Sequence, residues 1–127
     1  MAPSLPYFGP RRGFQNNGIV KCRGVRTSPL TKTASYTVLD DDPDLILVGA
    51  LSAHATITLP TAADNAGRTI TVLLAGDPGS YNVIVDGEGS ETINGAATKT
   101  NSDQYSMLRV TCNGTGWFIT GSAGTWT

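Results

Sequence analysis

The fold is decided by residues 55–74, ATITLPTAADNAGRTITVLL. Apolar and polar residues alternate over residues 55–59, which is the pattern of a half-buried β-strand. Pro60 ends this run, because proline has no backbone N–H to donate to a sheet. Residues 61–67 are small or polar and end in a glycine, which predicts one or two helical turns. Residues 69–74 are predicted to form the next strand.

The same sequence pattern continues on both sides of this stretch: short runs of β-favouring residues are separated by Gly, Pro, Asn and Asp. Further strands are predicted at residues 35–39, 45–48, 81–86, 91–93, 104–111 and 117–120, the last two as a hairpin around residues 113–116. About eight strands at a spacing of roughly ten residues are typical of a sandwich or barrel. The sequence therefore predicts an all-β fold, a compact antiparallel β-sandwich or jelly-roll-like domain over residues 34–127.

Residues 1–33 differ in texture and are predicted to form an extended basic N-terminal arm. Prolines interrupt the segment repeatedly, its apolar residues have no regular period, and the first acidic residue of the chain is Asp40. Residues 1–39 carry a net charge of +6, whereas residues 40–127 carry three basic residues against all ten acidic ones, a net −7. Such asymmetry suggests an arm that binds an acidic partner, which is nucleic acid, a protein surface or the body of a neighbouring copy.

The arm supplies the candidate partner-binding residues. Four arginines are expected to make electrostatic contacts, and three aromatic residues are expected to be apolar anchors. The full set is Tyr7, Phe8, Arg11, Arg12, Phe14, Arg23 and Arg26. A protein partner is preferred to nucleic acid, because the acidic body would repel nucleic acid.

Few residues of the body suggest chemistry. His54 is the only histidine, and no Gly-x-Ser-x-Gly elbow lies nearby to suggest a catalytic role. Because it lies between two predicted strands, we interpret it as an exposed loop residue. The acidic residues at 40, 41, 42 and 44 leave three alternatives open, which are a Ca²⁺ site, a solvated turn and a receptor for a basic arm. We predict no catalytic residue, no metal and no cofactor.

Two cysteines, Cys22 and Cys112, are too few for a disulfide framework or a zinc site, and we predict no bridge between them. Trp117 and Ile119 share one face of a strand, and Trp117 is predicted to pack in the core or in a subunit contact. The chain has no apolar run of transmembrane length and no signal-peptide core, which predicts a protein made and used without a secretory step.

Three segments, taken in order, resemble a β-domain that recurs in virion proteins of tailed bacteriophages. They are TITLPTAADNAGRTITVLL (56–74), NVIVDGEGSETINGAAT (82–98) and QYSMLRVTCNGTGWFIT (104–120). The family includes head decoration (cement) proteins, head fibres and tail fibres. The resemblance covers about residues 34–120, and the N-terminal arm has no counterpart in it.

The resemblance implies a structural virion protein, commonly a homotrimer, without catalytic activity. Because the chain has only a short arm and one domain, the resemblance favours a capsid decoration (cement) protein over a full fibre. Such a protein would lie on the exterior of the virion and be assembled in the host cytoplasm. This protein would bind the outer surface of the major capsid protein and stabilise the shell, with the arm as a staple. The alternative is a fibre or tail module that binds host-surface glycans. Neither a membrane nor nucleic acid is a predicted partner.

Overall fold

The structure, a computed structural model, describes residues 28–127. Nine strands and one single-turn 3-10 helix make up this part of the chain, so the fold is all-β, as predicted. The elements are β1 (Leu30–Lys32), β2 (Tyr36–Thr37), β3 (Leu45–Val48), β4 (Ala55–Thr58), η1 (Ala62–Asp64), β5 (Thr69–Leu74), β6 (Val83–Asp86), β7 (Thr98–Asn101), β8 (Met107–Cys112) and β9 (Trp117–Ala123). None of the helical structure in this range is long and apolar enough to cross a membrane.

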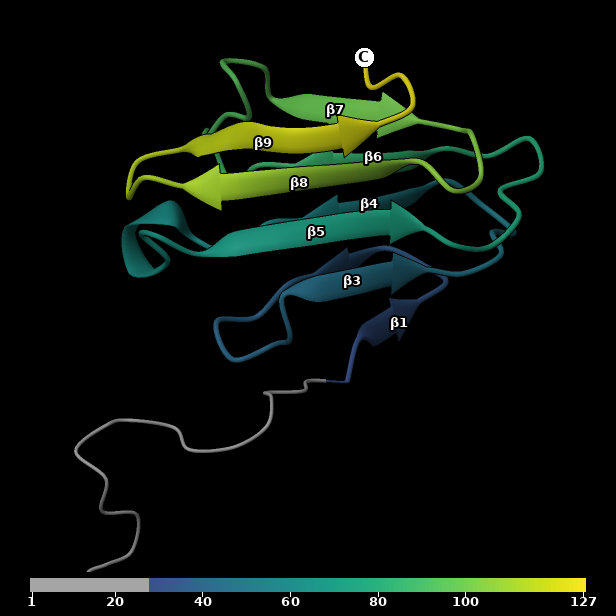
Figure 1. Ribbon diagram of the computed structural model, residues 1–127, viewed down its shortest axis with the longest axis horizontal. Helices are drawn as coiled ribbons and strands as arrows, with labels where there is room; N and C mark the ends of the chain where they lie inside the picture. Colours follow the sequence, from purple (N-terminus) through teal and green to yellow (C-terminus); the bar gives the residue numbers. More distant parts are fainter. Residues whose placement is uncertain (1–27) are drawn as a thin grey trace, which may run out of the picture.

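The strands form two sheets, one in front of the other in Figure 1. The five-stranded sheet has the order β1-β3-β5-β8-β9, and the four-stranded sheet has the order β2-β4-β6-β7. From β1 to β6 the chain enters the opposite sheet with every new strand. The neighbours in each sheet are therefore alternate strands of the sequence, and they pair in parallel as β1–β3, β3–β5, β2–β4 and β4–β6.

The predicted antiparallel arrangement is therefore wrong for the first six strands. The turn at residues 76–79 leads from β5 in one sheet to β6 in the other, so it joins two layers and not two neighbours in one ladder. Among the named strands of the described residues, the antiparallel pairs are β5–β8, β6–β7 and β8–β9. The β8–β9 pair is the hairpin that the sequence predicts.

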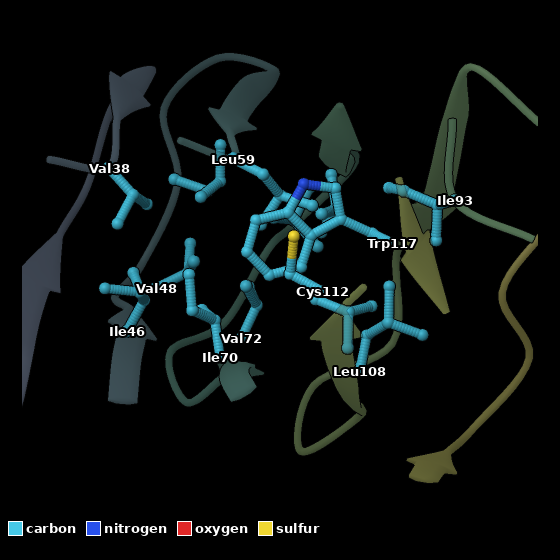
Figure 2. Packing of buried hydrophobic residues seen from close by; sticks show 14 of the residues in the cluster. Val38, Ile46, Val48, Leu59, Ile70, Val72, Ile93, Leu108, Cys112 and Trp117 are labelled. Atoms are coloured by element: carbon cyan, nitrogen blue, oxygen red, sulfur yellow. The ribbon is translucent and has the colours of Figure 1, made fainter. Parts of the chain in front are cut away.

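Both sheets contribute alternate residues to one core. In β4 and β5, for example, Ile57 and Ile70 are fully buried, and the residues on either side of each are partly exposed. Figure 2 shows Trp117 near the centre of this core beside the sulfur of Cys112. Ile119 packs against the same cluster, so of the two predicted environments, core and subunit contact, Trp117 lies in the core.

The first strand lies within the range that the sequence analysis assigns to the arm. Leu30 pairs with Ile46 of β3 and packs against the core, so the folded part begins no later than Leu30. The predicted domain start at residue 34 falls after this strand. Residues 1–27 of the predicted arm lie outside the described part of the chain.

Candidate binding surface

The outer side of the five-stranded sheet carries several large apolar side chains, and we call it the apolar face. Its apolar members are Leu45, Leu47, Leu73, Met107 and Phe118, of which Leu45 and Phe118 are 37% and 48% exposed. They alternate with buried core residues along their strands, and successive side chains of a strand point to opposite sides of the sheet. The face is therefore made by the same alternation that fills the core.

The strand registers arrange this face in three rows across the sheet. The first row is Thr31, Leu47, Leu73, Met107 and Ala123. The second row is Leu45, Thr71, Arg109 and Gly121. The third row is Thr69, Thr111 and Phe118. Cross-strand neighbours in such rows are in contact, so Leu47, Leu73 and Met107 of the first row form an apolar strip across β3, β5 and β8, the three middle strands of the sheet.

Arg109 is the one charged side chain in these three rows. Its guanidinium donates a hydrogen bond to the Thr120 carbonyl oxygen at 2.8 Å. A Cβ built on Gly121 would meet the guanidinium at 2.7 Å, so Arg109 lies flat over the position where β9 has a glycine. The positive charge is thus held at the β8–β9 side of the apolar face.

The outer side of the four-stranded sheet has a different composition, and we call it the threonine face. One row is Thr56, Ile84 and Thr100, and the next is Thr37, Thr58, Asp86 and Thr98. Only Ile84 among these is a large apolar residue. This face is therefore mostly hydroxyl groups, as is typical of a sheet surface in contact with water.

Residues 39–44, which we call the acidic loop, precede Leu45 and border the apolar face. Arg68 reaches into this loop, where its Nε lies 2.8 Å from Asp44 Oδ1. Its two terminal nitrogens donate to the carbonyl oxygens of Leu39, at 3.0 Å, and Asp42, at 2.7 Å. One planar guanidinium thus satisfies several acceptors of the loop at once, which an ammonium group cannot do with the same geometry.

A second set of contacts holds the loop against the sheets. The Tyr36 hydroxyl donates to Asp42 Oδ2 at 2.7 Å, and Lys32 Nζ lies 3.9 Å from the centre of the Tyr36 ring. The hydrogen bond to the carboxylate raises the pKa of Tyr36 above 10.0. Desolvation alone would raise the pKa of Asp42. The bonds from Tyr36 and the Leu39 N–H, with the nearby positive charges, outweigh it and hold the pKa of Asp42 below 3.8.

A shallow cleft of about 250 Å³ lies beside the acidic loop, where β2, β4 and β6 end. It is lined by Thr37, Val38, Leu39, Asp40, Pro60, Thr61 and Glu88. Leu39 is 53% exposed, and two carboxylates lie at the rim. None of the lining residues is aromatic, so the cleft offers no ring on which a sugar would stack.

The structure places the other singled-out residues away from any reactive arrangement. His54 is exposed, its Nδ1 accepts a hydrogen bond from the Asn82 N–H at 3.0 Å, and its ring packs edge-on against Tyr81. Cys112 is buried, with its Sγ 3.3 Å from the Ala62 carbonyl oxygen. Within residues 28–127, no three His, Cys, Asp or Glu side chains are grouped as a metal site requires.

Sequence reasoning missed the apolar face, Arg109 and the role of Arg68. The signal for the face is present in the outward positions of residues 45–48, 69–74 and 107–112, but the pairing order is needed to bring them together. All seven predicted partner-binding residues, from Tyr7 to Arg26, lie outside the described part of the chain. Comparison with models of protein families found no match, and comparison with curated proteins found none.

Proposed function

We propose that this protein is a capsid decoration (cement) protein, which binds the outer surface of the major capsid protein shell of a tailed bacteriophage. The observation that carries the proposal is the apolar face. A sheet surface with exposed leucine and phenylalanine and a single charge is typical of a surface that another protein chain covers in an assembly, whether a second copy or a different protein. The resemblance of about residues 34–120 to virion β-domains is the reason for proposing a bacteriophage capsid as the assembly.

The proposal includes a finer description of the fold. The two layers and their shared core fit a β-sandwich, wound in parallel over its first six strands, and residues preceding β1 act as an extended arm. The homotrimer and the virion exterior come from the same resemblance.

The charge distribution supports a role for the arm in attachment. Residues 1–27 contain five basic residues and no acidic one, whereas residues 28–127 contain four basic and ten acidic residues, a net −6. A basic segment joined to an acidic body favours an acidic surface elsewhere, here that of the shell. The residues proposed to contact the shell are Tyr7, Phe8, Arg11, Arg12, Phe14, Arg23 and Arg26.

The test is co-sedimentation of the full-length chain with shells that were assembled without it. We expect the chain to pellet with the shells and to raise the temperature at which they disassemble. A variant with glutamine at positions 11, 12, 23 and 26 is expected to bind more weakly. Arg11→Gln alone removes one of these charges and is compared with Lys99→Gln, which removes one positive charge from the body and is the matched control. If the unaltered chain does not pellet with shells, the proposal is wrong and host glycans become the ligand to test.

A further inference from the structure

We infer that the apolar face is buried against the apolar faces of neighbouring copies of this chain, around an axis that runs along β5. The inference names the partner of this face, and it rests on the proposed function for the premise that the face is a protein contact. It is carried by the charge of the face, by the place of β5 in the sheet and by the position of Arg109.

The apolar face allows two copies to approach without bringing their carboxylates into direct contact. Residues 28–127 carry a net charge of −6, and like charges brought together across an interface are costly. None of the ten acidic residues lies in the three rows of the face. Two copies that approach through this face therefore keep their carboxylates at its border.

The order of the strands makes the face complementary to itself. β5 is the central strand of the five, so rotation about an axis along β5 brings Leu73 of each copy together. The same rotation sets the β8 side of one copy against the β3 side of the next. Leu47 and Met107 flank Leu73 in one row, so apolar residues meet apolar residues in this arrangement.

The charges at the two sides of the face are also complementary. Arg109 lies in the same row as Leu45, with Thr71 of β5 between them. The rotation therefore brings Arg109 next to Leu45 of the neighbouring copy and to the acidic loop that precedes it. Asp41 in that loop is exposed and forms no ion pair within the described range. A cation at one side and anions at the other favour this orientation of the copies.

The basic N-terminal segment is a poorer occupant of the face. Residues 1–27 carry five positive charges, and the rows of the face offer them one arginine and no carboxylate. A neighbouring copy brings both an apolar strip and an acidic loop. The face therefore fits a second copy better than it fits this segment.

The first experiment measures the mass of the full-length chain in solution, without shells, by size-exclusion chromatography with light scattering. Each chain is 13.3 kDa, and we expect a species of two or three chains. Leu73→Glu is expected to weaken association by at least about 30-fold, the effect of a central interface residue. Ile84→Glu changes the middle of the threonine face and is expected to leave the mass unchanged. Circular dichroism shows whether each variant is folded.

Two further experiments, a charge swap and a cross-link, test the orientation and do not depend on Leu73→Glu folding. Arg109→Glu is expected to weaken association, and combination with Asp41→Arg is expected to restore it. In a chain with Cys22→Ser, Leu73→Cys is expected to be joined to its counterpart by a bifunctional maleimide that spans about 10 Å, the separation of packed sheets. Ile84→Cys in the same background is expected to remain unlinked.

A single-chain mass for the unaltered protein would overturn the inference, as would an unchanged mass in folded Leu73→Glu. If Leu73→Glu loses binding to shells and keeps its mass, the face contacts the shell, so the inference is wrong and the proposed function stands. If the protein associates through this face and ignores shells, the inference stands and the proposed function is wrong. Failure of the charge swap to restore association overturns the orientation.

Discussion

The two outer faces of the molecule differ although the strands behind them are built alike. In both sheets every second residue fills the shared core, so the outward positions alone distinguish the sheets. On one sheet these positions include three leucines, a methionine and a phenylalanine beside four threonines, and on the other the only large apolar residue is Ile84 and five of seven are threonine. Threonine suits a pleated surface as well as the larger residues do, so folding does not require the difference. This difference is what we expect if the apolar residues make the proposed contact outside the chain.

The largest effect on the free energy of unfolding is expected from changes in the core, to which both sheets contribute in the same way. Ile70→Ala in the five-stranded sheet and Ile57→Ala in the four-stranded sheet each remove a fully buried side chain from one core. We expect each variant to lose about 2–5 kcal/mol of the free energy of unfolding. Urea denaturation measures both. A large loss in one variant and almost none in the other would show that the sheets do not share a core. The two sheets would then differ in more than their outer faces.

A smaller loss is expected at the border of the apolar face. Arg68→Ala leaves the carbonyl groups of the acidic loop without their donor, and we expect a loss of about 2–3 kcal/mol. Arg68→Lys keeps the charge and is expected to recover only part of this, because it lacks the planar fork. Thermal unfolding measures both variants. Lys99→Ala is the control, and an equal loss there would contradict the role of Arg68.

The next change makes the threonine face resemble the apolar face. Thr56 and Thr100 flank Ile84 in one row, so Thr56→Leu with Thr100→Leu produces an apolar strip on the second sheet. We expect the free energy of unfolding to change by no more than about 0.5 kcal/mol, as for other surface positions. Association should rise, because each copy then has two adhesive faces and can form open chains. Light scattering against concentration measures this, and unchanged solubility and mass would contradict it.

The smallest effect is expected from pH at the contact between Tyr36 and Asp42. The pKa of Asp42 is lowered in the folded state, so its contribution to stability is present above 3.8 and is lost as the pH falls below that value. The pKa of Tyr36 is raised, so its contribution is present below 10.0 and is lost as the pH rises above it. Tyr36→Phe should weaken both dependences. Melting temperatures across the pH range measure them, and parallel curves for the two proteins would contradict the assignment.

Much of the fold can be predicted from the sequence. The strands at residues 45–48 and 69–74 are found where the pattern predicts them, and the expected helical connection is the 3-10 turn η1. β7 was missed, because residues 98–101 alternate lysine, threonine and asparagine without an apolar side. The parallel pairing was missed for another reason. A turn sequence indicates that the chain changes direction. It does not indicate whether the next strand lies in the same sheet or in the opposite one.

Less of the candidate surface could be predicted. Leu47, Leu73 and Met107 come from strands far apart in the sequence, and only the register places them in one row. Arg68 looks like an ordinary surface charge until the acidic loop is folded around it. By contrast, the exposed His54 follows from its place between two predicted strands, and the buried Trp117 follows from local alternation. Neither prediction needs knowledge of the strand pairing.

The alternation of the chain between the two sheets has a consequence for its synthesis. In the first six strands a ladder joins residues distant in sequence, such as Leu45 with Thr71, whereas in the β8–β9 hairpin Cys112 pairs with Trp117. Ladders of long sequence separation form slowly, and short ones form first. We therefore expect a nascent chain to stay sensitive to protease until the hairpin has left the ribosome. The test uses ribosome-bound chains stalled before residue 107, which lack the hairpin. If such chains already resist protease, the long-range ladders form without the hairpin and the expectation is wrong.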